Sequence, residues 1–332
     1  MKPGGRTLQP AAKKARLLRA FLAGEPVHCT WQLSPRCESF CHLCDHRAES
    51  ALDEIDAAAC AAVAEALGRE STLLVTFTGS EPFLRPDLAE IVAAVSARHV
   101  PLLVTNGWLV SPARARAVWE AGLEAATVAL EDALPEAHDD RTGVPGSHAR
   151  AVRAVVALAE ARTRRGQKVN VRVRLRGKDL APLERVLVLA SRLGATVTAE
   201  AAFPLPLLNG DAPSLVARLR DLKRHNPHLR NAATAVEGMG PALSGGKGGC
   251  LAGKAFFNVD HRGRASKCVE FRAEPDRVGN LTEEAASRVR PRLRAAHAAN
   301  ACQACWYASR AEVEALYSVR GFLSGLRTLV TA

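Results

Sequence analysis

The sequence predicts an α/β fold: a partial (β/α)6 barrel of parallel strands followed by a small C-terminal α+β domain. Apolar, β-rich runs alternate with stretches of helical periodicity over the first two thirds of the chain. This alternation stops after Phe203, and a glycine-rich stretch then precedes a shorter, differently patterned region. Strands that alternate with helices form a parallel sheet, and the regular repeat favours an open or partial barrel.

Six runs carry the strand pattern, each followed by a polar turn and a helical stretch. The expected strands are Val27–Leu33, Leu73–Thr78, Leu102–Thr105, Ala125–Leu130, Val169–Leu175 and Ala195–Ala199.

The intervening stretches have helical stripes of apolar residues. The stripe from Leu88 to Val95 follows Pro86, which suits a first helical position, and Ser147 is the expected N-cap of a later helix. A basic helix is expected at about 212–226, and a hairpin over Ala255–Asp260 and Ala265–Val269.

We therefore divide the chain into four parts. These are a basic helical segment at 1–25, the barrel at 26–235, a glycine-rich linker at 236–249 and a C-terminal domain at 250–332.

Composition narrows the class of protein. The chain has 332 residues, 48% hydrophobic and 24% charged, which is ordinary for a globular protein. No apolar run reaches the ~18 residues of a membrane span, and the N-terminus lacks the apolar core of a signal peptide. We expect a cytoplasmic protein. The net charge is +11, but aromatic residues make up only 5%, so no nucleic-acid partner is expected.

The nine cysteines are unevenly distributed. An odd number in a large chain without a secretory signal argues against a disulfide framework and favours metal or catalytic use. Seven of them form two groups, one near each end of the chain, and Cys29 and Cys60 fit buried apolar positions.

The first group directly follows the first expected strand. Cys37, Cys41 and Cys44 are separated by three and then two residues. Three thiolates on one short loop can bind a cubane iron–sulfur cluster and leave one iron open. A zinc site completed by His42 or His46 is the alternative. The position of this cysteine loop at the end of the first strand of a barrel favours a catalytic role.

This segment resembles the signature of the radical SAM superfamily, Cys-x3-Cys-x2-Cys. The resemblance implies that Cys37, Cys41 and Cys44 ligate a 4Fe–4S cluster whose open iron binds S-adenosylmethionine (SAM). It also implies reductive cleavage of SAM to a 5′-deoxyadenosyl radical, and it places Leu43 near the adenine.

The loop after the second strand extends the resemblance. Gly79, Ser80, Glu81 and Pro82 are similar to the family's Gly-Gly-Glu-Pro, which is implied to bind the SAM amino group, with serine in place of the second glycine. Arg150 stands where related enzymes meet the SAM carboxylate, although a helix-surface arginine is equally expected there.

The second group comprises Cys250, Cys268, Cys302 and Cys305. Together with the turn at Gly263, it resembles the SPASM/twitch extension of radical SAM enzymes, in the shorter twitch form. The resemblance implies that the four thiolates hold one auxiliary 4Fe–4S cluster. A four-thiolate zinc site is the alternative.

We therefore expect a radical SAM enzyme that abstracts a hydrogen atom from a peptide or small molecule; the residues that act on substrate are unknown. A flavodoxin or ferredoxin as electron donor is implied, and a separate peptide-recognition protein is possible. Two alternatives remain open: a non-enzymatic zinc or iron–sulfur protein that binds polyanions, and a degenerate relative that no longer cleaves SAM.

Overall fold

A computed structural model describes residues 8–39, 41–42, 54–68, 72–206, 208, 210–270, 276–318 and 321–323. The predicted site residues Leu43 and Cys44 lie outside this set. Among the described helices, none combines the length and apolar character needed to cross a membrane.

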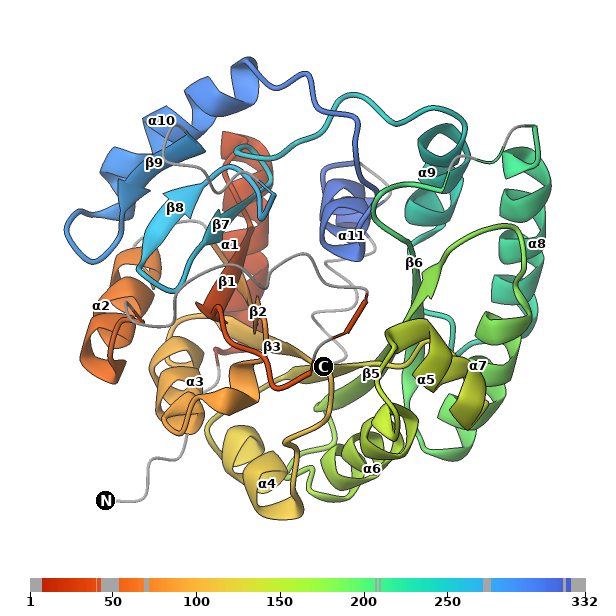
Figure 1. Ribbon diagram of the computed structural model, residues 1–332. Helices are drawn as coiled ribbons and strands as arrows, with labels where there is room; N and C mark the ends of the chain where they lie inside the picture. Colours follow the sequence, from red (N-terminus) through yellow and green to blue (C-terminus); the bar gives the residue numbers. More distant parts are fainter. Residues whose placement is uncertain are drawn as a thin grey trace.

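Six parallel strands curve into an open barrel, as predicted (Figure 1). They are β1 His28–Ser34, β2 Leu74–Gly79, β3 Val100–Thr105, β4 Ala125–Ala129, β5 Lys168–Leu175 and β6 Thr196–Ala201. Each strand pairs in parallel with the next one along the chain. All six carboxyl ends therefore meet at one rim of the barrel, and the loops that follow the strands gather there.

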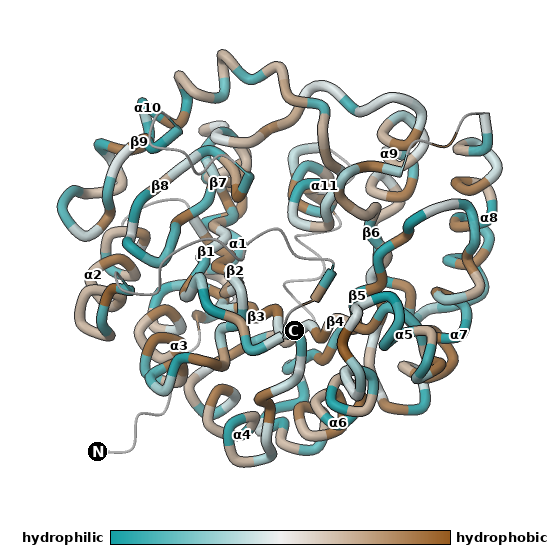
Figure 2. Tube along the Cα trace, in the orientation of Figure 1, coloured by the Kyte–Doolittle hydropathy of each residue, from teal (hydrophilic) through white to brown (hydrophobic). Residues whose placement is uncertain are grey.

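Helices cover the outside of this sheet (Figure 1). They are α2 Ala57–Gly68, α3 Leu88–Ser96, α4 Pro112–Glu120, α5 Pro135–Thr142, α6 Ser147–Glu160, α7 Ala181–Arg192, α8 Ala212–His225 and α9 Ala233–Leu243. Helix α1 (Pro10–Ala23) instead packs against residues at the beginning of the strands, such as Val27 and Leu73. Along α7 and α8, hydrophobic and hydrophilic stretches alternate, as expected for helices that bury one face (Figure 2).

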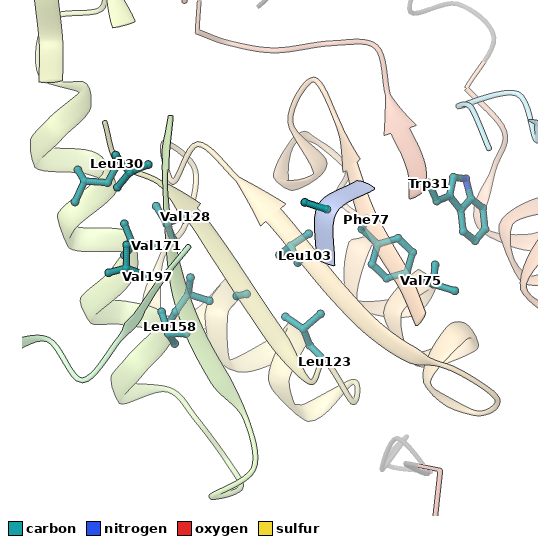
Figure 3. Packing of buried hydrophobic residues seen from close by; sticks show 14 of the residues in the cluster. Trp31, Val75, Phe77, Leu103, Leu123, Val128, Leu130, Leu158, Val171 and Val197 are labelled. Carbon is teal, nitrogen blue, oxygen red and sulfur yellow. The ribbon is translucent and has the colours of Figure 1, made fainter. Parts of the chain in front are cut away.

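The main hydrophobic core lies between the sheet and these helices. Val128, Val171 and Val197 on three neighbouring strands lie beside Leu158 of α6 (Figure 3). The opposite face of the strands carries small and polar side chains, such as Thr76 and Thr127, which line a cavity. Complete (β/α)8 barrels fill their interior with bulky aliphatic residues. The interior of this barrel instead contains a cavity.

The C-terminal region continues the barrel sheet. Strand β7 (Phe256–Val259) pairs in parallel with β1, and β8 (Arg264–Ser266) and β9 (Arg277–Asn280) follow in antiparallel order. The predicted hairpin is present as β7 and β8. Helix α10 (Ala286–Ala298) packs near β9, and α11 (Ala308–Leu316) lies between β6 and β7, across the open side of the barrel (Figure 1).

The glycine-rich segment expected as a linker at 236–249 differs from the prediction in its first half. Helix α9 continues to Leu243, and its Gly238 packs against the indole of Trp306, where a Cβ atom would come within 2.0 Å of the ring. The glycine provides close packing rather than flexibility, a role that composition does not reveal.

Two helix starts also differ from the sequence expectation. Helix α3 begins at Leu88, so Pro86 lies in the preceding turn. In α6 the N-cap is Gly146, and the Asp139 carboxylate accepts the backbone N–H groups of Gly146 and His148 at 2.5 and 2.8 Å. Asp139 therefore does the capping that we expected of Ser147.

Candidate functional site

A cavity of about 520 Å³ occupies the barrel interior and opens at the carboxyl ends of the strands. Residues from every one of the six parallel strands line it, together with Cys37 and Cys41 from the loop after β1. Ligand sites in barrels of this kind are built from these loops. The cavity thus contains the predicted first cysteine group, as far as the structure describes it.

Cys37 is held by two hydrogen bonds to its sulfur. The backbone N–H of Ser39 and the side-chain amide of Asn106 donate to Cys37 Sγ at 3.3 and 3.5 Å. Such bonds stabilise a thiolate and tune iron–sulfur clusters. Within the described part of the chain, no three His, Cys, Asp or Glu side chains form a group that could hold a metal ion.

Gly79 and Ser80 line the cavity beside this loop. Gly79 has a φ of 120°, and a Cβ atom there would lie 2.5 Å from the carbonyl oxygen of Ser34, so only glycine fits. The Ser80 hydroxyl donates to the carbonyl of Pro35 at 2.7 Å. The serine that departs from the family pattern therefore fastens the β2 loop to the segment leading to Cys37.

Glu81 is fully buried, and the described residues that line the cavity do not include it or Pro82. Its carboxylate accepts the N–H groups of Phe83 and Asn106, both at 2.9 Å, and the hydroxyl of Thr105 at 2.8 Å. Burial raises the pKa of Glu81 to about 7, against the effect of these hydrogen bonds. The structure thus shows Glu81 joining the loops after β2 and β3.

Arg150 is also absent from the described lining of the cavity. Its guanidinium stacks on the indole of Trp108, 3.9 Å from the ring centroid, and Trp108 itself lines the cavity. Arg150 therefore supports a cavity wall through an aromatic side chain.

Charged side chains on β5 and its neighbours form two ion pairs in the cavity. The Arg174 guanidinium lies 2.7 Å from the Glu131 carboxylate, and Arg172 Nε lies 3.3 Å from the carboxylate of Glu200. All four residues line the cavity. The alternating arginines of β5 thus face the barrel interior.

The four C-terminal cysteines border a second cavity of about 200 Å³. Cys250 precedes β7, Cys268 follows β8, and Cys302 and Cys305 precede α11, yet all four line this one space. Burial raises the pKa of Cys268 to about 12 and that of Cys305 to about 11. All four cysteines of the second group therefore border one space, although no three of the described side chains form a group that could hold a single metal ion.

The two cavities share part of their walls. Phe203, Glu270 and Tyr307 line both, and the Tyr307 hydroxyl donates to the Glu270 carboxylate at 2.9 Å. The second cysteine group thus lies directly behind one wall of the barrel cavity.

Sequence reasoning missed three residues of these sites. They are Asn106, Trp108 and Tyr307, which are not among the site residues that the sequence predicts. Asn106 and Trp108 could have been found from their position just after β3, because residues there reach the same rim as Cys37. Tyr307 stands two residues after Cys305, which is the only sequence signal it gives.

Comparison with known proteins agrees with this geometry. Residues 31–190 match the family model described as the Radical SAM superfamily. Mycofactocin maturase MftC of Mycobacterium tuberculosis (strain CDC 1551 / Oshkosh) is 32% identical over 186 residues, which cover 55% of this chain and 46% of MftC. The PqqA peptide cyclase of Gluconobacter oxydans (strain 621H) is 28% identical over 179 residues, covering 52% and 48%.

Among solved structures, Streptococcus suis SuiB has a similar fold. With S-adenosylmethionine bound, it aligns with a TM-score of 0.65 at 12% identity, over 79% of this chain and 64% of SuiB. With the precursor peptide SuiA bound, it aligns with a TM-score of 0.63 at 13% identity, over 92% and 76%. The sequence matches span about half the length of the curated relatives.

Proposed function

The chain belongs to the radical SAM superfamily, and from this we propose that it is an enzyme that cleaves SAM reductively and abstracts a hydrogen atom from a peptide. In this proposal Cys37, Cys41 and Cys44 hold the catalytic 4Fe–4S cluster. The observation that carries it is the shared cavity: Cys37 and Cys41 line the same space as Gly79 and Ser80.

The described residues fit such a cluster. The Cys37 sulfur already accepts two hydrogen bonds, as a ligating thiolate does. When bound, the cluster supplies the electron that cleaves SAM to a 5′-deoxyadenosyl radical. A flavodoxin or ferredoxin would deliver that electron.

The chain's own residues position SAM and shield it. Gly79 has no side chain, so the loop after β2 packs closely against the backbone of Ser34 while it lines the cavity. Glu81 holds the loops after β2 and β3 together, which fixes Asn106 against Cys37. Trp108, supported by Arg150, offers an aromatic face to the cavity. Glu81 and Arg150 thus act in this proposal through Asn106 and Trp108.

We further propose that Cys250, Cys268, Cys302 and Cys305 hold one auxiliary 4Fe–4S cluster. The four thiols line one space of about 200 Å³, which a cluster of several irons would occupy. A single zinc ion needs its thiolates to converge at ~2.3 Å, and the described residues form no such group. Its place behind the wall of Glu270 and Tyr307 would let it exchange electrons with substrate bound in the barrel.

A peptide is the substrate class that the comparisons support. MftC is named a maturase and the Gluconobacter protein a peptide cyclase, and SuiB has been solved with a precursor peptide. The cavity of about 520 Å³ extends from the rim to residues near the beginning of the strands, such as His28 and Ala125, so it could admit SAM together with a peptide side chain.

The test of the clusters is iron and sulfide per chain after anaerobic reconstitution. Two cubanes predict about eight irons. We expect about four to remain after Cys37, Cys41 and Cys44 are changed to Ala, and about four after the other group is changed to Ala. Zinc in place of iron, or an unchanged iron content, would refute the proposal.

The test of the reaction is 5′-deoxyadenosine formation by the reduced protein. A peptide pool carrying deuterium on carbon should transfer deuterium into 5′-deoxyadenosine, whereas deuterated monosaccharides should not. The Cys37/Cys41/Cys44→Ala variant is the control. If SAM is cleaved and deuterium is transferred from the monosaccharides but not from the peptides, the substrate is a small molecule and not a peptide.

A further inference from the structure

A buried arginine borders the cavity of the four C-terminal cysteines. Arg310, on α11, is only 1% exposed, and it lines this cavity. Its guanidinium donates to the carbonyl oxygens of Cys305 at 2.8 Å, Lys247 at 2.7 Å and Gly248 at 3.2 Å. Few arginines are buried so completely unless they are paired.

The partner of this cation is Glu314, one helical turn later. Arg310 Nε donates to Glu314 Oε1 at 3.0 Å, and the same oxygen accepts the backbone N–H of Leu251 at 2.9 Å. The pair therefore connects the residue after Cys250 with the carbonyl of Cys305. Those two cysteines come from distant parts of the chain.

The two charges lie at different distances from the cavity. Arg310 is among its described lining residues, and Glu314 is not. The Arg310 guanidinium thus borders the space that the four thiols line, and its countercharge lies one helical turn further along α11. Glu270 is the other charged side chain of the described lining, and its carboxylate accepts the Tyr307 hydroxyl.

We propose that the Arg310–Glu314 pair sets the reduction potential of the auxiliary cluster, with Arg310 raising the potential and Glu314 lowering it. This inference rests on the proposed function, because it requires the four cysteines to hold a cluster. Reduction adds one negative charge to a group that four thiolates already make anionic. A buried cation stabilises the reduced form more than the oxidised form, and a nearby carboxylate does the reverse.

Because Arg310 lines the cavity and Glu314 does not, the effect of the cation outweighs that of the carboxylate, and the cluster becomes a better electron acceptor. Water is excluded from the cation, so its effect is screened less than that of a surface charge. Arg310 is therefore a positioning and tuning residue that acts through the cluster, and the potential is the property that reports on it.

The experiment uses the chain with Cys37, Cys41 and Cys44 changed to Ala, so that the auxiliary cluster alone contributes to the spectrum. Its midpoint potential is measured by anaerobic redox titration followed by electron paramagnetic resonance. Arg310→Gln removes the charge, Arg310→Lys retains it, and Glu314→Gln removes the countercharge. Iron per chain is determined for every sample.

We expect Arg310→Gln to make reduction at least tenfold less favourable, a fall of ~59 mV for one electron, and Glu314→Gln to raise the potential. Arg310→Lys should stay near the reference. Opposite shifts from two changes at one ion pair cannot come from structural loosening, which would move both the same way.

Equal potentials, or shifts of one sign, would overturn the proposal. If Arg310→Gln does not fold, the Glu314→Gln result decides alone: a rise supports the proposal, and no rise refutes it. A reference chain that holds no iron would instead refute the auxiliary cluster itself, and the inference with it.

Discussion

The side-chain amide of Asn106 lies 3.5 Å from the sulfur of Cys37 and donates a hydrogen bond to it. The same amide donates to the Glu38 carboxylate at 3.0 Å. Asn106 follows β3 and Cys37 follows β1, so the bond crosses the rim of the barrel. It joins the loop of the first cysteine group to the loop after β3, where the sequence predicts no site residue.

Changing Asn106 to Ala should therefore lower the reduction potential of the catalytic cluster. The Cys37 sulfur would lose the hydrogen bond from Asn106, and hydrogen bonds to sulfur favour the reduced, more negative cluster. The potential is measured in a Cys250/Cys268/Cys302/Cys305→Ala background. Asn226→Ala is the matched control, because among the described residues that amide donates to the carbonyl of Leu222, within its own helix end, and to no cysteine. Equal potentials in both variants would contradict the prediction.

Glu81→Gln should weaken both folding and SAM binding. Glu81 accepts three hydrogen bonds through two oxygens, and a glutamine would direct an NH2 group at a donor. One buried donor left unpaired costs ~1–3 kcal/mol, so we expect a lower midpoint of chemical unfolding and at least tenfold weaker SAM binding.

The control is Glu120→Gln, at a side chain that is 58% exposed. SAM affinity is measured by equilibrium dialysis under anaerobic conditions. Normal SAM binding by Glu81→Gln, together with normal stability, would show that the loops after β2 and β3 do not depend on this carboxylate.

The contrast between Glu81 and the cysteines shows what local sequence can predict. Periodicity predicted all six barrel strands, because each buries its alternate residues under the helices that follow. The spacing of the cysteines indicated two groups, and the structure places Cys37 and Cys41 at one cavity and the four C-terminal cysteines at another. The direction of the Glu81 carboxylate depends on Thr105 and Asn106, more than twenty residues away, and no local pattern specifies that contact.

The same reason explains Arg310 and Gly238. Arg310 is one arginine among many on basic helices, and only the convergence of α11 with the segments around Cys305 and Gly248 buries it. The sequence predicts Gly238 as part of a flexible linker, whereas in the structure it packs against the indole of Trp306. Hydrophobic periodicity predicts the fold, but contacts between residues far apart in the sequence decide the roles of residues such as Arg310 and Gly238.

For the Glu131–Arg174 pair in the barrel cavity, we expect the single variant to lose more free energy of unfolding than the double variant. Arg174→Met leaves the Glu131 side chain, which is 1% exposed, without its partner, and should destabilise the chain by ~3–5 kcal/mol. The double variant Glu131→Gln/Arg174→Met should lose less free energy of unfolding than Arg174→Met alone, because neither member of the pair then carries a charge.

The free energy of unfolding is measured by urea denaturation. Arg220→Met, from the exposed Arg220–Glu237 pair, is the control and should change it by less than ~1 kcal/mol. A double variant less stable than Arg174→Met would show that the pair is retained for its net stability.

The buried histidine at the beginning of β1 predicts a pH dependence of stability. Burial lowers the pKa of His28 to about 4, whereas an unfolded histidine titrates near ~6.5. The unfolded chain therefore binds the proton more readily between these values. Stability is fully present above pH ~6.5 and falls as the pH drops toward 4, by about 3 kcal/mol for this one group.

His28→Gln should reduce that loss. Glutamine can keep the hydrogen bond that His28 Nε2 makes with the Thr76 hydroxyl at 2.8 Å, but it does not titrate. Urea denaturation of the cluster-free chain between pH 4 and 7 measures the slope. His99 and His138 also have pKa values lowered to about 4 by burial, so part of the slope remains in the variant. His225→Gln, at a side chain that is 73% exposed, should retain the full slope; equal slopes in the two variants would mean that His28 is not the buried neutral group described here.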